Sequence, residues 1–568
     1  MRFLRMLTNA LLAGALGAAY LTILLLQLNP QVPLASGSVW RWYLTLAGFY
    51  GVHLALVFYV VMLLREFVSF GAFSPGWISV RLLAWLSATA AAVASLLMWL
   101  NLRGFPYVFD EAAARRFAFG AGATTVAAVV LLGIAVAHYS SGRRGSRVGA
   151  ALLAIAITGS LALPIAARGA GGEPPLGARR VALATAPPRA TARIILLLLD
   201  GASLEYVWPR VAAARLPNFG RLLDAGASMD LATIRPTQPD PVWAAVATGM
   251  YPSKNGVRSA SSYFAPGDHR AVDLLPAHCF SHVLVRLGVV QDRPNTSAAW
   301  RARPLWSILG DYGISAGVVR WPLTYPAQPL TGFMVTDRFH QMVGSMFEFD
   351  GRAAYPDEIV AVAREAFNAN GSAAADAVAA SARRDEAYAR AAREIRATTP
   401  VEVEAIRYQA IDAASHVYLR YAEGSGFGDV TAAERERFGP LMDRYYAYVD
   451  GEIGAAVERL APGDLLLVVS GFGMQPVGPV KHAAARVLRD PEFSGTHEYG
   501  PDGFLLAYGS SVTPGRRRRG SVVDVTPTIL YYLGLPIGRD MDGFARADLF
   551  DERFTAAHPI AYIPSHGR

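Results

Sequence analysis

Cysteine and lysine are almost absent from this chain. One cysteine, Cys279, and two lysines, Lys254 and Lys481, occur among 568 residues. A single thiol excludes an internal disulfide bond and a metal site built from cysteines. The other basic side chains are arginines scattered along the chain, so the net charge of +8 indicates no compact nucleic-acid-binding module. Guanidinium groups suit phosphate and anionic lipid, although a coding bias explains the same composition.

Charge is also scarce, at 17% of residues, while hydrophobic residues make up 53% and the mean hydropathy is +0.27. The apolar excess is concentrated in the first third of the chain. Because a bilayer span takes about 20 apolar residues, we predict an all-α transmembrane domain of five helices over residues 1–168. These spans hold few ionisable groups, which disfavours a transporter or channel. The predicted spans are residues 4–26, 42–64, 82–100, 117–137 and 148–166.

The orientation of the spans follows from the arginines that flank them. Arg2, Arg5, Arg65 and Arg81 lie in segments that we expect to face the cytoplasm, as do three arginines at 143–147. An odd number of spans then places the rest of the chain outside. We therefore predict a multi-pass inner-membrane protein with a C-terminal domain on the extracytoplasmic, periplasmic side. A linker rich in Gly, Ala and Pro, residues 169–192, joins the two parts.

The remaining residues, 193–568, alternate between strand-like and helix-like runs. Continuous apolar runs at 194–199, 316–320 and 465–470 read as buried strands, and helical patterns at 216–225 and 243–247 lie between the first two. This alternation predicts an α/β domain with a mostly parallel sheet flanked by helices. The Ala-, Arg- and Glu-rich residues 353–399 are predicted to form a helical insertion. Asp200 follows the first strand, at the sheet edge where α/β proteins bind ligands.

Several short motifs in a shared order carry a family resemblance. They are LLLDG at 197–201, PTQPDPVW at 236–243, ATGMYP at 247–252, DAASH at 412–416, SGTH at 494–497 and DVTPTIL at 524–530. Together they resemble the alkaline phosphatase superfamily, closest to its type I phosphodiesterase/nucleotide pyrophosphatase branch. The resemblance covers most of residues 193–551. It implies an alkaline-phosphatase-like fold and a two-metal site for phosphoryl transfer.

The resemblance implies a first metal held by Asp412, His416 and His497. One carboxylate and two imidazoles also suit Zn²⁺ on chemical grounds and leave a coordination position open. We therefore expect a divalent metal, zinc, at this site. The alternative is that Asp412 and His416 form only a surface pair one helical turn apart.

The second metal of such enzymes uses the first-strand aspartate and an Asp-His pair within a Ser-Asp-His-Gly sequence. Asp200 matches the first of these ligands. Gly471 and Phe472 stand where the Asp-His pair is expected, and neither side chain ligates a cation. Without this pair, the second metal site is incomplete. Asp240 or His482 would be a replacement ligand, or Lys481 a replacement positive charge.

The position of the nucleophile departs from the family as well. Pro239 falls at the family's Thr or Ser position, and Thr237 lies two residues earlier. A small shift in the loop would bring the Thr237 hydroxyl to the N-terminus of the next helix, where phosphate binds well. Alternatively, Thr237 caps that helix or forms a turn beside Pro236.

Two functions follow from these observations. The first is a membrane-anchored, metal-dependent phosphodiesterase or phosphotransferase-like hydrolase that acts on phosphoesters outside the cytoplasm. Spans ahead of an external domain also resemble the phosphoethanolamine and glycerolphosphate transferases, which suggests a lipid or cell-envelope substrate. The second is a catalytically impaired superfamily member that binds a phosphorylated envelope component or a protein partner.

Overall fold

The structure is a computed structural model that divides into two compact units. Unit 1 comprises residues 1–175 and 261–294, and unit 2 comprises residues 176–260 and 295–568. The described residues are 2–68, 75, 77–139, 147–172, 192–279, 281–343, 352–369, 376–422, 430–478, 482–483 and 494–567. Most of the predicted linker at 169–192 lies outside them.

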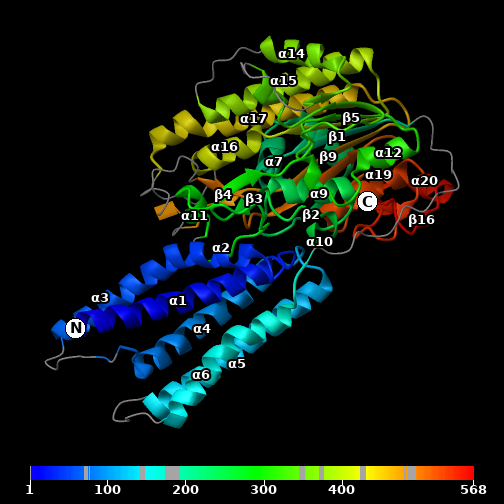
Figure 1. Cartoon of the computed structure of the whole chain (residues 1–568). Helices are drawn as coiled ribbons and strands as arrows, with labels where there is room; N and C mark the ends of the chain where they lie inside the picture. Colours follow the sequence, from blue (N-terminus) through cyan, green and yellow to red (C-terminus); the bar gives the residue numbers. More distant parts are fainter. Residues whose placement is uncertain are drawn as a thin grey trace. The chain divides into compact units, whose positions relative to one another are not determined.

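Among its described residues, unit 1 contains five helical spans that are long and apolar enough to cross a membrane, as predicted (Figure 1). The second span is interrupted by a π-helical turn, η1. Small residues let this turn approach α1 closely, because a Cβ atom built on Gly14 would lie 2.1 Å from the carbonyl oxygen of Gly51. The helices are α1 (Arg2–Leu28), α2 (Gly37–Leu46), η1 (Ala47–Gly51), α3 (Val52–Val68), α4 (Val80–Gly104), α5 (Glu111–Tyr139) and α6 (Arg147–Arg168).

The segment 261–294 belongs to unit 1 although it interrupts the sequence of unit 2. It contains β3 (Ser261–Phe264), α11 (His282–Arg286) and β4 (Gln291–Pro294). Two buried asparagines at helix ends bind its backbone. The Asn29 side chain accepts from the amide of Leu274 at 3.0 Å and donates to its carbonyl at 2.8 Å. The side chain of Asn101 makes the same pair of bonds with Ala277, at 2.8 and 3.1 Å.

Unit 2 is built on a mostly parallel sheet with the order β13-β2-β12-β9-β1-β8-β5-β6-β7 among the described residues. The centre of the sheet, β9-β1-β8-β5-β6, is parallel, whereas β12 runs antiparallel to β9 and to β2. The strands are β1 (Ile194–Leu199), β2 (Ala227–Ala232), β5 (Ala316–Val319), β6 (Gly332–Val335), β7 (Ala354–Tyr355), β8 (Val403–Tyr408), β9 (Leu465–Phe472), β12 (Asp502–Tyr508) and β13 (Gly515–Arg516); β14 (Gly520–Ser521) pairs with β2.

Helices cover both faces of this sheet, which explains why its central strand is entirely apolar (Figure 1). Leu196 and Leu198 of β1 face a core that includes α9 (Pro239–Thr248), α12 (Leu305–Asp311) and α19 (Val525–Tyr532). Ile195, Leu197 and Leu199 face the opposite core. That second core is covered by α7 (Leu204–Ala212), α8 (Pro217–Ala225), α14 (Ile359–Asn368), α15 (Ala377–Thr398), α16 (Ala410–Tyr418) and α17 (Ala432–Glu458). The α/β fold and the apolar N-terminal helices are thus confirmed.

Within residues 353–399 the structure describes β7, α14 and α15. The longer helix, α15, contributes to the main core of unit 2. It buries Tyr388 and Ile395 completely in the core on its side of the sheet.

Candidate active site

Three predicted ligands come together at the carboxyl end of the sheet. Asp412 lies in the first turn of α16, directly after β8, and His416 follows one helical turn later. His497 comes directly after β11 (Gly495–Thr496), a short strand that pairs with β10 (Gln475–Pro476). One potential ligand atom from each of these side chains lies within 4.8 Å of the others. Asp412, His416 and His497, hereafter the triad, are therefore one cluster and not an isolated pair on a helix surface.

Backbone carbonyls orient both imidazoles of the triad. Nδ1 of His416 donates to the carbonyl oxygen of Gly495 at 2.9 Å, and Nδ1 of His497 donates to that of Thr237 at 2.9 Å. A hydrogen on Nδ1 leaves Nε2 as the lone-pair nitrogen of each neutral ring. This arrangement is typical of metal-binding histidines, whose second nitrogen is held by a carbonyl or carboxylate.

Asp412 completes the triad with an unsatisfied carboxylate. Its Oδ1 is buried and has no hydrogen-bond partner among the described residues, and its Oδ2 lies 3.7 Å from Nε2 of His416. Burial raises the pKa of Asp412, although the two imidazoles lower it. An unpaired buried carboxylate is costly unless a cation accompanies it. The donor set and this orphan oxygen fit a divalent metal with a coordination position left open.

A buried ion pair supports the helix that carries two triad members. Asp385 of α15 accepts hydrogen bonds from the backbone amides of Gln409 and Ala410, at 3.1 and 2.9 Å, where α16 begins. Arg320 pairs with Asp385, and both side chains are almost completely buried. The anion at this helix N-terminus is therefore fixed by a cation behind it, and α16 is held from its first turn.

Asp200 is buried at the end of β1 and is already engaged by an arginine, Arg407 of β8. The Arg407 Nε lies 3.1 Å from both carboxylate oxygens, its Nη2 donates to Oδ2, and the indole nitrogen of Trp243 donates to Oδ1 at 2.7 Å. Arg407 lies opposite Leu198 in the parallel register, so both side chains project from one face of the sheet. Sequence reasoning missed Arg407; the available signal was an arginine inside a short strand.

The positions expected to complete a second metal site are filled by apolar packing. A Cβ atom on Gly471 would lie 2.5 Å from Cγ1 of Val242, so the space beside that strand is taken. The Phe472 ring packs against the His497 ring with centroids 5.1 Å apart. With Asp200 engaged by Arg407 and Trp243, the described residues here do not fit a second cation. Lys481 lies outside the described residues.

Thr237 is fully buried and contacts the triad through His497. Its backbone amide donates to the carbonyl of Glu498 at 2.8 Å, and its own carbonyl accepts from His497. The Thr237 hydroxyl donates to the carbonyl of Ile234 at 2.9 Å. Asp240 follows in the first turn of α9, where burial raises its pKa to about 7, with Arg407 opposing the shift.

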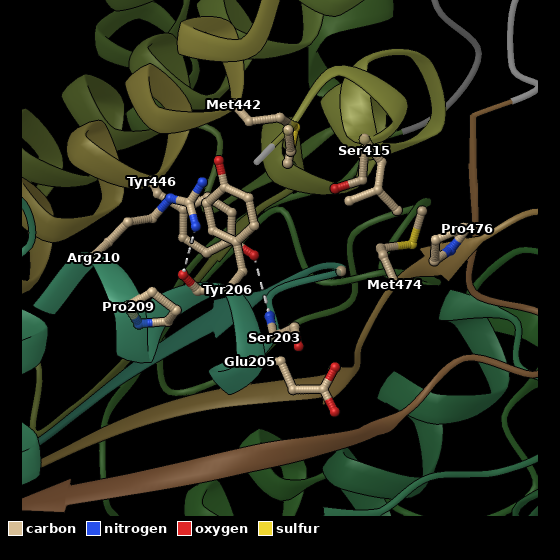
Figure 2. A pocket seen from close by; sticks show the side chains of 13 residues that line it. Ser203, Glu205, Tyr206, Pro209, Arg210, Ser415, Met442, Tyr446, Met474 and Pro476 are labelled. Carbon is tan, nitrogen blue, oxygen red and sulfur yellow. Dashed lines mark hydrogen bonds between the residues drawn. The ribbon is translucent and has the colours of Figure 1, made fainter. Parts of the chain in front are cut away.

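A pocket of about 480 Å³ borders the same segments (Figure 2). Gly201 and Ser415, the chain neighbours of Asp200 and His416, contribute to its wall. Figure 2 shows the Tyr206 and Tyr446 rings lying one over the other, with the Arg210 guanidinium beside them. The two rings stack with centroids 4.3 Å apart, and the guanidinium carbon lies 3.3 Å from the Tyr206 centroid. The wall also includes Ser203, Glu205, Met442 and Met474.

One protein-family model matches this chain, and several solved structures align with part of it. The sequence model of the type I phosphodiesterase/nucleotide pyrophosphatase family matches residues 194–500. Among solved structures, mouse ectonucleotide pyrophosphatase/phosphodiesterase 5 aligns at 12% identity over 63% of this chain and 100% of its own, with a TM-score of 0.37. An inactive form of the mouse protein in complex with AMP aligns at 12% identity over 64% and 100%, with a TM-score of 0.38.

The human protein of the same name aligns at 13% identity over 63% of this chain and 100% of its own, with a TM-score of 0.36. No curated protein sequence matches the chain. The family model covers more than half of the chain and includes β1 and the triad. The chain therefore belongs to the type I phosphodiesterase/nucleotide pyrophosphatase family.

Proposed function

We propose that this protein is a membrane-anchored phosphodiesterase or phosphotransferase-like hydrolase that uses one divalent metal at the triad. The observation that carries the proposal is the Oδ1 of Asp412, which is unpaired among the residues that the structure describes and lies beside two histidines whose Nδ1 atoms are both held by carbonyls. A bound divalent ion would polarise a phosphoester oxygen and stabilise the charge that develops there. Zinc is the metal that this donor set favours.

The proposed nucleophile is the Thr237 hydroxyl. Two backbone hydrogen bonds hold Thr237 next to the triad, one of them to His497 itself. To attack a phosphoester, the hydroxyl must turn away from the carbonyl of Ile234. The proposed proton acceptor is Asp240, because a carboxyl with a pKa near 7 exchanges protons efficiently at neutral pH.

The proposed location is the inner membrane, with unit 2 on the periplasmic side and a lipid or cell-envelope phosphoester as the substrate. Support comes from the arginine-flanked spans and from unit 1, where the chain leaves the helical bundle. Arg168, the last residue of α6, donates to the backbone carbonyls of Asn29 and Val32, at 2.8 and 2.6 Å, just after the first span. The exit from the last span thus shares one end of the bundle with the exit from the first.

Turnover and metal content of the full-length protein test this proposal together. We expect hydrolysis of a model phosphodiester with about one equivalent of bound zinc, and loss of turnover in Thr237→Ala with the metal retained. Thr248→Ala, which removes a buried hydroxyl that donates within α9, is the matched control and should keep its turnover. Absence of turnover on every phosphodiester tried, with or without added metal, would contradict an enzymatic role.

A second candidate function is binding without turnover. It is favoured by the burial of the Thr237 hydroxyl and by the pairing of Asp200 with Arg407. This candidate predicts that the metal-loaded protein binds inorganic phosphate or a phosphoester and releases it unchanged. Thr237→Ala would then leave the affinity for phosphate unaltered.

A further inference from the structure

We propose that Arg407 supplies the second positive charge of the phosphate site, in the place where a second metal ion would bind, so that the site takes a single divalent metal. The inference rests on the proposed role of the triad as the metal site. It extends that role by assigning phosphate positioning to a residue of the sheet itself.

The geometry of Asp200 is the first support. The Arg407 Nε and Nη2 atoms cover both carboxylate oxygens, and the Trp243 indole adds a donor to Oδ1. A carboxylate that accepts this many hydrogen bonds has few lone pairs left for a cation. Both partners are fixed in turn, because Arg407 lies within β8 and Trp243 is fully buried in α9.

Charge is the second support. An assembly of one divalent ion and two carboxylates has no net charge. A guanidinium paired with one carboxylate has no net charge either. Gly471 stands where the family's second carboxylate is expected, and Arg407 adds a cation to the remaining carboxylate, Asp200. In this arrangement Asp200 does not bind a metal ion. Its carboxylate instead neutralises the buried guanidinium of Arg407.

Proximity to the triad is the third support. A Cβ atom on Gly201, the residue after Asp200, would lie 3.0 Å from Cα of Asp412. Removal of either charge must therefore change the affinity of the triad for a cation and the affinity of the site for an anion, in opposite directions.

The experiment measures Zn²⁺ and inorganic phosphate binding by calorimetry in the full-length protein. Arg407→Met leaves the Asp200 charge uncompensated, so we expect roughly tenfold tighter zinc binding and roughly tenfold weaker phosphate binding. Asp200→Asn should give the reverse of both changes. The double variant Asp200→Asn/Arg407→Met should return both affinities to within about threefold of the wild type.

Arg320→Met is the matched control, because it removes another buried arginine that is paired with an aspartate. A purely structural loss lowers both affinities together. If Arg407→Met lowers both affinities, or changes neither, the proposal is overturned. If Arg407→Met does not fold, Asp200→Asn and the neutral double variant still decide by the sign of their changes.

The experiments distinguish failure of the proposed metal site at the triad from failure of the proposed role of Arg407. A wild-type protein that binds no zinc contradicts the proposed metal site, while the effect of Arg407→Met on phosphate binding in the metal-free protein still tests Arg407. A wild-type protein that binds two equivalents of zinc, with the second lost in Asp200→Asn, contradicts the assignment of Arg407 but leaves the triad in place.

Discussion

Each half of the candidate site contains a buried carboxylate, and the surroundings of the two carboxylates differ. In the triad half, Asp412 keeps a buried oxygen that has no partner in the described part of the chain, and backbone carbonyls orient the two imidazoles. In the Asp200 half, the carboxylate is fully engaged by Arg407 and Trp243. The donor set of one half thus fits a cation from solution, whereas the carboxylate of the other half is paired with a cation of the protein itself.

This difference shows that a buried carboxylate at a strand end is no evidence of a metal site by itself. What distinguishes the halves is the hydrogen bonding around each carboxylate, which is complete for Asp200 and incomplete for Asp412. An orphan oxygen has to be compensated, whereas an engaged one is already stabilised.

The largest effect is expected from the loss of a triad ligand. His416→Ala removes one of three protein donors, so zinc affinity should fall by roughly a hundredfold or more. His558→Ala is the control, because its Nδ1 also donates to a backbone carbonyl, that of Phe554, while the residue lies outside the triad. Zinc affinity is measured by competition with a chelating dye. Equal affinities of the two variants would show that the triad does not bind the metal.

The support of α16 comes next in size. Asp385→Asn leaves the buried Arg320 without its counter-ion and should lower the free energy of unfolding by about 3–5 kcal/mol. Asp230→Asn, which breaks the exposed pair with Arg516, should cost less than about 1 kcal/mol. Chemical unfolding of both variants in detergent compares them, and similar losses would mean that α16 is not held through Asp385.

Restoring a carboxylate to the Asp200 half should fail. In Gly471→Asp the new Cβ collides with Val242, so we expect a destabilisation of about 1–3 kcal/mol and no second equivalent of bound metal. Val242→Ala in the same chain should recover most of the stability. The number of bound metal ions is measured by mass spectrometry. A second equivalent of bound metal in either variant would show that Arg407 does not exclude a cation.

A pH dependence at Asp240 is expected as a separate effect. Burial raises its pKa to about 7, so the folded state prefers the protonated carboxyl. This preference favours folding fully below pH 4, the range of the unfolded carboxyl, and the contribution is lost as the pH rises through 7. Asp240→Asn should therefore gain in thermal unfolding temperature relative to the wild type as the pH increases from 4 to 8. A difference that stays constant over this range would contradict the shifted pKa.

The sequence predicts the central strands because continuous apolar runs produce them. The run at 194–199 is β1, the run at 316–320 contains β5, and the run at 465–470 lies in β9. Strand β8 was missed because Glu404 and Arg407 interrupt its apolar pattern. Both are buried with partners far away in the sequence: Arg459 pairs with Glu404 at 2.8 Å, and Asp200 pairs with Arg407.

The candidate site could be predicted only where its members share short motifs. The four-residue spacing of Asp412 and His416 places them one helical turn apart, and the family pattern adds His497. The hydrogen bonds of Asp200 with Arg407 and Trp243 form because β1, β8 and α9 pack together. No local spacing in the sequence encodes these contacts. For this reason the sequence raised doubt about the second metal but did not reveal Arg407.

The most direct measurement is a crystal structure of the full-length protein soaked with zinc, with anomalous scattering recorded at the zinc edge. We predict one anomalous peak, bound by Asp412, His416 and His497, with Asp200 still hydrogen-bonded to Arg407. A second peak beside Asp200, with the Arg407 guanidinium displaced, would contradict the account.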